Sequence, residues 1–314
     1  TELVEIVGIE PTSLEIITNR VYRWEGNGDH FIFGGHSNLY EKIMDMEDIR
    51  KLQEIVEAAD KLDMQGKVVI VTGGAKGVGA GISQCFLEAG ASVAVVGRTP
   101  PERLPACGAN EASFWQADVR DYDQLSACTD AIVARYGRID VLVNNAGGAP
   151  NADAATASPR FSESIIRLNL LAPLNFSQLA NRVMQQQQSG GTIINIASVS
   201  AIRPSPGTAA YGAAKAGLVN LCTSLAVEWA PKVRVIAVIS GLVVTEQAHL
   251  HYGDDAGIAA VGRTIPLGRM AVPADIGNVC LFLASPLASY ISGSAITVHG
   301  GGEAPAFLAA SNAD

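Results

Sequence analysis

The feature that most constrains the fold of this chain is a regular alternation of short β-branched runs with longer helical patterns, which begins at Lys67. Such a rhythm is typical of βαβ units that build a parallel sheet. Several runs are apolar at nearly every position, as expected for strands covered on both faces by helices. The candidate strands are residues 68–72, 92–96, 113–116, 141–144, 191–196, 233–239 and 295–298.

Seven strands alternating with helices predict an α/β fold, namely a Rossmann-type doubly wound parallel seven-stranded sheet with helices on both faces. We expect residues 64–314 to form this as one catalytic domain. About 250 residues is a normal upper size for a single hydrophobic core.

Residues 1–63 have a different character and predict a small N-terminal appendage. Asn27-Gly28-Asp29 is a turn signal between two apolar runs, which indicates a hairpin. Apolar residues then recur at three- and four-residue spacing from Ile43 to Leu62, which predicts an amphipathic helix. The appendage is expected to pack on the main domain or on a sister subunit. A fusion remnant stays open, since Met64 would make a natural start.

Charge and cysteine usage exclude several classes of protein. A net charge of −9 disfavours nucleic acid and anionic membrane surfaces as partners. The five cysteines are scattered without zinc spacing, so they indicate apolar core positions in a reducing compartment, and no metal site is predicted. With no long apolar run and no basic, apolar start, the chain is expected to be soluble and cytoplasmic.

The segment from Val68 to Gly79 is a buried strand that runs into a glycine-rich turn and then a helix, expected at Ala80 to Ala89. Without Cβ atoms at Gly73, Gly77 and Gly79, the backbone can approach a pyrophosphate closely. The N-terminus of the following helix offers free N–H groups and a favourable dipole. A glycine cluster alone is a weak signal, but its position between strand and helix favours nucleotide binding.

This Thr-Gly-x-x-x-Gly-x-Gly pattern resembles the classical short-chain dehydrogenase/reductase family. Three further features support the resemblance, which covers residues 66–302. Asn144-Asn145-Ala146-Gly147 closes the fourth strand. Tyr211 and Lys215 lie one helical turn apart on one face. Ser198 precedes the tyrosine by 13 residues, and Asn169 lies in an Arg-Leu-Asn-Leu segment, both at family positions.

Ketone reduction explains the need for these side chains. The developing alkoxide requires a proton donor at hydrogen-bond distance, and Tyr211 can be that acid. Lys215 is expected to lower the pKa of the tyrosine by its charge, and Ser198 to orient the substrate oxygen. The resemblance implies that Lys215 also holds the nicotinamide ribose and that Asn169 holds a water linking Lys215 to solvent. The alternative for Asn169 is an amide that satisfies the backbone at a helix irregularity.

The end of the second strand indicates the cofactor. NAD enzymes carry an acidic residue there, whereas this chain has Gly97-Arg98. A guanidinium suits a phosphate, and Lys76 lies where family members that prefer NADP carry a second basic residue. The prediction is therefore NADP(H). By resemblance the cofactor-binding residues are Gly73, Lys76, Gly77, Val78, Gly79, Arg98, Asp118, Val119, Asn145, Ala146, Gly147, Tyr211, Lys215, Gly241, Val243 and Thr245.

The chain departs from the family pattern where an Asn-x-x-x-Pro-Gly segment is usual. Ser240 replaces the proline, which makes the wall beside the nicotinamide less certain. The stretch from Thr245 to Pro266 corresponds to the family's mobile lid and is expected to set specificity. Its His249 and His251 are predicted to be exposed lid residues rather than ligands or bases.

The predicted activity is an NADP(H)-dependent interconversion of a ketone and a secondary alcohol. The four-residue step from Tyr211 to Lys215 argues against the enoyl reductase branch, whose spacing is longer. A 3-oxoacyl thioester, a steroid or other alicyclic ketone and a sugar stay open, with a hydrophobic substrate favoured. A silent NADP-binding regulator would normally lose the tyrosine or the lysine. A scaffold built around residues 1–63 is the other alternative. The resemblance implies a homotetramer, with the helix from Ala209 to Glu228 at an interface.

Overall fold

The computed structural model describes residues 61–305 and residue 310, and the expected N-terminal hairpin and helix lie outside this range. Its centre is a seven-stranded sheet in the order β5-β2-β1-β6-β7-β8-β9, with every pair of neighbours parallel. The strands are β1 (Val68–Thr72), β2 (Ser92–Gly97), β5 (Ser113–Gln116), β6 (Val141–Asn144), β7 (Gly191–Ser198), β8 (Val233–Ser240) and β9 (Ala295–Val298). The predicted doubly wound fold is confirmed.

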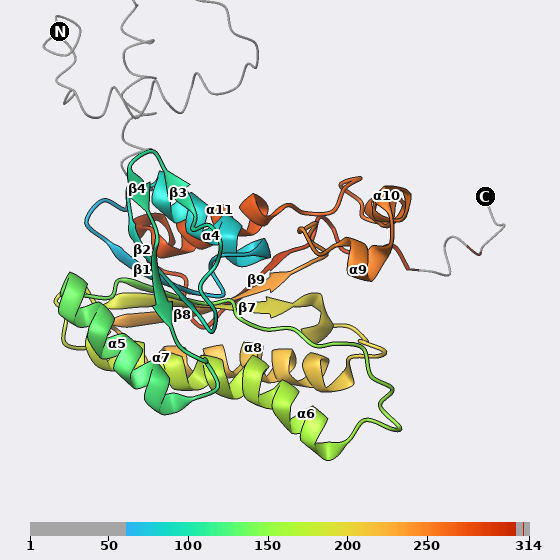
Figure 1. Cartoon of the computed structure of the whole chain (residues 1–314), viewed down its shortest axis with the longest axis horizontal. Helices are drawn as coiled ribbons and strands as arrows, with labels where there is room; N and C mark the ends of the chain where they lie inside the picture. Colours follow the sequence, from blue (N-terminus) through green and yellow to red (C-terminus); the bar gives the residue numbers. More distant parts are fainter. Residues whose placement is uncertain (1–60, 306–309, 311–314) are drawn as a thin grey trace, which may run out of the picture. The chain divides into compact units, whose positions relative to one another are not determined.

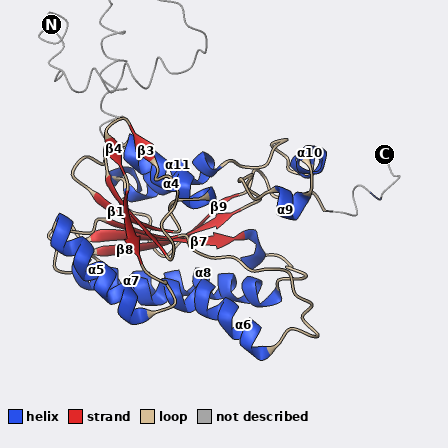
Figure 2. Cartoon of the chain, in the orientation of Figure 1, coloured by secondary structure: helices blue, strands red, loops and turns tan. Residues whose placement is uncertain are grey.

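Helices cover both faces of this sheet (Figure 1). One layer contains α4 (Gly77–Glu88) and α11 (Pro273–Ala284), which pack closely on each other. The opposite layer contains α5 (Tyr122–Tyr136), α6 (Pro159–Ile166), α7 (Ala172–Met184) and α8 (Ala209–Trp229). Figure 2 shows the strands enclosed between the two helical layers. This sandwich explains why β1 is buried at all five positions.

The observed strands match the predicted apolar runs, except that some strands extend beyond their predicted ends. β7 and β8 each continue to a serine, Ser198 and Ser240, which are paired with each other in the register. Both strands therefore carry a hydroxyl at the carboxyl edge of the sheet, where ligands bind in folds of this type. A serine in place of the family's proline allows β8 to continue its ladder to Val298 on β9.

The helix after the glycine turn begins at Gly77, three residues before the predicted start at Ala80. The prediction was wrong because glycine is a poor helix former in isolation, whereas here Gly77 has a φ of 52° and opens the helix directly from the turn. The consequence is that the free N–H groups of α4 lie within the glycine-rich loop itself.

Smaller elements complete the described chain. The two-stranded pair β3 (Ala106–Cys107) and β4 (Asn110–Glu111) was not predicted, because two residues carry no periodicity. Two short helices, α9 (His249–Tyr252) and α10 (Asp255–Arg263), lie beyond the carboxyl ends of β8 and β9 (Figure 1). Three short turns of helix are η1 (Arg167–Leu171), η2 (Val199–Ala201) and η3 (Pro286–Ala288). Over the described residues, no helix has the length and apolar character to cross a membrane.

Candidate active site

A cleft of about 910 Å³ lies at the carboxyl edge of the sheet. It is lined by segments far apart in the sequence, which the parallel strands bring to one edge. Of the predicted site residues, the structure places in its wall Gly73, Lys76, Val78, Gly79, Arg98, Asp118, Val119, Asn145, Ala146, Gly147, Ser198, Tyr211, Lys215, Gly241, Val243 and Thr245. Gly77 and Asn169 lie behind this wall rather than in it.

The glycine-rich loop is packed too tightly for side chains. A Cβ atom at Gly79 would lie 2.2 Å from the Gly73 carbonyl oxygen and 2.6 Å from Asn145 Nδ2. Asn145 Nδ2 donates to the Thr72 carbonyl at 2.9 Å, and the Thr72 hydroxyl accepts from the N–H groups of Asn145 and Ala146. The Asn-Asn-Ala-Gly segment thus clamps the loop against the end of β1. The result is a backbone cradle that fits a dinucleotide pyrophosphate.

Ser198, Tyr211 and Lys215, the side chains predicted to be catalytic, lie together in the wall of the cleft. Tyr211 and Lys215 lie one turn apart on α8, and the Lys215 Nζ atom lies 5.6 Å from the centroid of the tyrosine ring. Tyr211 and Ser198 both line the cleft, and the Ser198 hydroxyl lies close enough to the phenol to influence its pKa. Lys215 is buried, and its ammonium donates to the Ile196 carbonyl at 2.8 Å. Two hydroxyl-bearing side chains therefore line the cleft beside a buried cation.

The pKa shifts in this group have burial as their first cause. Burial lowers the pKa of Lys215 to about 8. Burial also raises the pKa of Tyr211 above its usual value, and the nearby Ser198 hydroxyl only partly offsets this. The net shift in this structure is therefore opposite to the lowering that we expected from the charge of Lys215. The physical reason is that the cost of desolvating a phenolate outweighs the other contributions.

Asn169 lies in η1, a π-helical turn between α6 and α7, and is fully buried. Its amide donates to the carbonyls of Gly148 and Ile165, both at 3.0 Å, and its oxygen accepts from the Gly148 N–H at 2.9 Å. A Cβ atom at Gly147 would lie 2.6 Å from Asn169 Oδ1 and 3.2 Å from Lys215 Nζ. Asn169 and Lys215 therefore flank Gly147, and the asparagine both satisfies the backbone at the helix irregularity and fixes the loop beside the lysine.

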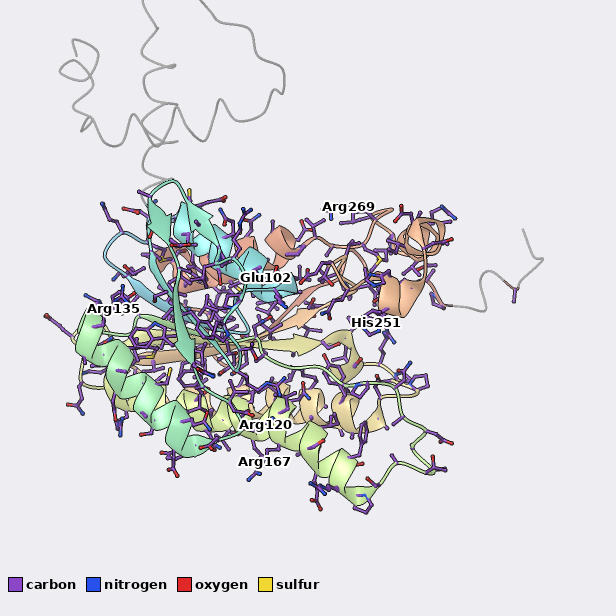
Figure 3. All side chains as sticks on the ribbon, in the orientation of Figure 1. Glu102, Arg120, Arg135, Arg167, His251 and Arg269 are labelled. Carbon is purple, nitrogen blue, oxygen red and sulfur yellow. The ribbon has the colours of Figure 1, made fainter. Side chains whose placement is uncertain are left out.

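Several basic side chains line the part of the cleft where the sequence predicts the adenosine of the cofactor, which we call the adenosine end. Lys76 and Arg98 both lie in its wall as predicted. Sequence reasoning missed Arg120, which also lines this end and is labelled in Figure 3. Its guanidinium grips Asp118 with Nε at 2.9 Å and Nη2 at 2.6 Å. These hydrogen bonds lower the pKa of Asp118 to about 2, with a smaller contribution from the charge of Arg98.

The opposite end of the cleft is built from loops. The lining includes Val243 and Thr245, which follow β8, and His251 and Tyr252 of α9, of which His251 is labelled in Figure 3. Arg203, which follows η2, also lines this end and was missed because a lone arginine in a loop has no motif. Among the described residues, no group of His, Cys, Asp and Glu side chains could hold a metal ion.

One contact links the two ends. The carboxylate of Glu246, the residue after Thr245, accepts from the Gly77 N–H at 3.0 Å. A Cβ atom at Gly77 would lie 3.4 Å from the Thr245 methyl group. The first residues of the lid segment therefore pack on the glycine-rich loop at the N-terminus of α4.

Comparisons with known proteins agree with this geometry. A family model described as enoyl-(acyl carrier protein) reductase matches residues 73–303. The chain is 34% identical over 245 residues to the 3-oxoacyl-(acyl carrier protein) reductase of Thermotoga maritima, covering 76% of this chain and 98% of the relative. It is 33% identical to the 2-dehydro-3-deoxy-D-gluconate 5-dehydrogenase of Escherichia coli, over 76% of this chain and 96% of the relative.

Further similarity comes from a steroid enzyme and a solved structure. The 3alpha-hydroxysteroid dehydrogenase of Mediterraneibacter gnavus is 34% identical, over 76% of this chain and 97% of the relative. The structure of Thermoplasma acidophilum aldohexose dehydrogenase superposes with a TM-score of 0.70 at 31% identity, over 76% of this chain and 94% of that one. The cleft, the glycine-rich loop and these relatives together show that the chain belongs to the short-chain dehydrogenase/reductase family of nicotinamide-dependent oxidoreductases.

Proposed function

We propose that this protein is an NADP(H)-dependent oxidoreductase that interconverts a ketone and a secondary alcohol. The observation that carries the proposal is that Ser198 and Tyr211 lie together with the buried ammonium of Lys215 in the wall of the same cleft as the glycine-rich loop. A nicotinamide bound in this cleft supplies or accepts the hydride.

The residues of the chain supply the proton and the orientation. In reduction, Tyr211 donates its phenolic proton to the carbonyl oxygen as negative charge develops there. Ser198 donates a second hydrogen bond to the same oxygen and fixes its position. The resulting phenolate is stabilised by the Lys215 ammonium, which lies 5.6 Å from the ring centroid. In oxidation, the same groups act in reverse.

Selection of the cofactor rests on the adenosine end. We assign the 2′-phosphate of NADP(H) to Arg98 and Lys76, because a guanidinium and an ammonium match a phosphate in charge and geometry. Arg120 adds a third cation nearby, although it is engaged by Asp118. Asp118 and Val119 would then flank the adenine ring.

The substrate is proposed to be hydrophobic, such as an alicyclic or steroid-like ketone or a 3-oxoacyl thioester. Apolar side chains at the substrate end support this, since Leu242 and Val199 line the cleft there. Enoyl reduction, which the description of the matching family model raises, is disfavoured by the four-residue step from Tyr211 to Lys215. We also propose that the protein is a cytoplasmic homotetramer.

The test compares oxidation of NADPH and NADH with a panel of ketones for the wild type and for Tyr211→Phe. Loss of a general acid is expected to lower turnover by about 10³-fold while NADPH still binds, as measured by its fluorescence. Tyr290→Phe is the matched control, because Tyr290 is fully exposed and should tolerate the change. Unchanged turnover in Tyr211→Phe would overturn the mechanism, whereas NADPH binding without turnover of any ketone would favour a regulatory role.

A further inference from the structure

An ion pair lies across the substrate end of the cleft. The Arg203 Nη2 atom lies 2.9 Å from the Glu303 carboxylate, which joins the loop after β7 to the segment after β9. Both side chains are a little over one third exposed, at 38% and 39%, so a solute can reach them. Arg203 lines both the main cleft and an adjoining cavity of about 290 Å³, and Glu303 lines the latter.

The backbone of Arg203 lies close to Ser198 in the sequence and is held by the η2 turn. Ser198 caps η2 by accepting from the Ser200 N–H, and the Arg203 N–H donates to the Val199 carbonyl at 3.1 Å at the end of that turn. Arg203 thus follows Ser198 by five residues through one short hydrogen-bonded turn. Arg203 therefore lines the same cleft as Ser198 and Tyr211, from a backbone position that the turn fixes.

The lid contributes a third side chain to the same place. Burial raises the pKa of Tyr252 on α9, the charge of Arg203 lowers it, and the charge of Glu303 raises it again. The phenol of Tyr252 is therefore close enough to feel both members of the ion pair. Side chains from the η2 loop, the lid and the segment after β9 converge at the mouth of the cleft.

Glu303 is attached through a run of three glycines. Gly300, Gly301 and Gly302 have φ values of 66°, 97° and 87°, in the region that favours glycine. Glycine exchanges between backbone conformations at little steric cost. The carboxylate of Glu303 thus follows a glycine segment whose backbone conformation other residues rarely adopt, whereas the backbone of Arg203 is held by η2.

Without Glu303, no acidic side chain would remain near Arg203 in the described lining of the two cavities. Of the described residues that line the main cleft, Asp118 is the only acidic one, and Arg120 engages it at the adenosine end. In the adjoining cavity Glu303 is the only acidic residue among those described. Besides Arg203, the remaining side chains there are those of His299 and of four apolar residues, Val199, Ile202, Leu242 and Ile265. An apolar body with one anionic end would fit both the walls and the guanidinium.

We propose that Arg203 is a specificity-determining residue that binds a carboxylate of the substrate, and that Glu303 occupies its guanidinium until the substrate exchanges with it. The proposal rests on the proposed function and narrows it to a hydrophobic oxo acid or hydroxy acid. A guanidinium pairs with a carboxylate through two parallel hydrogen bonds, so the exchange leaves Arg203 paired throughout. Tyr252 lies where it would contact the same group.

The test uses one ketone in a charged and a neutral form, 4-oxocyclohexane-1-carboxylate and its methyl ester, with NADPH. The wild type should have a kcat/KM about tenfold higher or more for the carboxylate, the effect of one charged hydrogen-bonded pair. Arg203→Gln should abolish that preference while changing kcat/KM for the ester by less than about threefold. Glu303→Gln should raise kcat/KM for the carboxylate severalfold and leave the ester unaffected, because it removes the competing anion.

The matched control is Arg182→Gln. Arg182 forms an exposed pair with Asp130 at the same 2.9 Å, far from the cleft lining, and its loss should leave the preference intact. A wild type that prefers the ester, or a preference that survives Arg203→Gln, would overturn the proposal.

Failure of the proposed function can be separated from failure of the anion site. If neither ketone is reduced, calorimetry measures the dissociation constants of cyclohexanecarboxylate and its methyl ester for the protein saturated with NADP⁺. A tighter carboxylate whose advantage disappears in Arg203→Gln supports the anion site even without turnover. Equal dissociation constants for the carboxylate and its methyl ester would contradict the proposed anion site.

Discussion

The two ends of the cleft differ in how their residues are held. At the end proposed to bind the cofactor and carry the catalytic side chains, residues are attached to a strand terminus or a long helix, as Lys215 on α8 and Asn145 after β6 illustrate. At the substrate end, Arg203, Tyr252 and Glu303 come from a short turn, a four-residue helix and a glycine-rich segment. Parallel strands place the first set by topology, whereas the second set is positioned by contacts between loops.

This difference agrees with the proposed division between proton transfer at one end of the cleft and substrate recognition at the other. Proton transfer tolerates little displacement of the reacting groups, so rigid elements suit it. Substrate choice can change with a few loop side chains on the same scaffold. We therefore expect similar substitutions to change stability and ligand affinity by different amounts at the two ends of the cleft. Single substitutions at each end test this expectation.

The largest contrast should come from adding one methyl group at a glycine of each end. Gly79→Ala places a Cβ atom 2.2 Å from the Gly73 carbonyl oxygen, and both atoms belong to the cradle. Such overpacking should cost about 3 kcal/mol of unfolding free energy and weaken NADPH binding by more than tenfold. Denaturant unfolding and fluorescence titration measure the two effects.

Gly262→Ala is the counterpart at the substrate end. Gly262 lies inside α10, and its added Cβ atom would meet nothing closer than 3.6 Å. Alanine is the better helix former, so the variant should be as stable as the wild type or up to about 1 kcal/mol more stable. Equal losses in the two variants would remove the distinction between the ends.

The second largest effect concerns the buried ammonium. Because burial lowers the pKa of Lys215 from 10.5 to about 8, the unfolded chain binds more protons than the folded one between these pH values. Stability relative to Lys215→Met should therefore rise with pH across this window, by up to about 3 kcal/mol. Urea unfolding of both proteins at pH 7.5, 9 and 10 measures this difference, since other titrating groups cancel. A difference that stays flat would show that Lys215 is not desolvated as described.

The cofactor end should also respond to loss of charge. Arg98→Ser removes the guanidinium assigned to the 2′-phosphate and should lower the ratio of kcat/KM for NADPH over NADH by roughly 10- to 100-fold. The value of kcat/KM should fall for NADPH and stay unchanged for NADH, because NADH has no phosphate at that position. Arg182→Ser, at an exposed ion pair outside the cleft, serves as the control. A ratio that is unchanged in Arg98→Ser would contradict the assignment of NADP(H).

How much could be predicted from the sequence follows the same division. The β-branched runs predicted all seven strands of the main sheet. A strand covered on both faces, such as β1, is buried at every position and therefore has an apolar residue at nearly every position. Motif spacing predicted that Ser198, Tyr211 and Lys215 would meet, since strand ends and one helical turn fix their geometry. The start of α4 at Gly77 was missed, because the phosphate-loop conformation overrides the low helix propensity of glycine.

The residues that sequence reasoning missed are held by tertiary contacts. Arg120 is paired with Asp118, two residues away. From the sequence, we assigned Asp118 and Val119 to the adenine site and did not consider this ion pair. Arg203 and Glu303 are 100 residues apart, and no periodicity connects a turn after β7 with the end of the chain. The raised pKa of Tyr211 was likewise hidden, since the sequence shows the neighbouring lysine but not the burial of both groups.

The smallest expected effect lies at the one contact between the two ends. Glu246 of the lid segment accepts from the Gly77 N–H at the N-terminus of α4, where a carboxylate is favoured by the helix dipole. Glu246→Gln keeps an acceptor but removes the charge, so unfolding should become easier by about 0.5 kcal/mol. NADPH should nevertheless bind severalfold more tightly, because its phosphates no longer share the loop with a negative charge. Glu303→Gln is the matched control for cofactor affinity, since Glu303 lies outside the main cleft lining. Weaker NADPH binding in Glu246→Gln would mean that the carboxylate supports the loop for the cofactor, and the two ends of the cleft would then act as one unit.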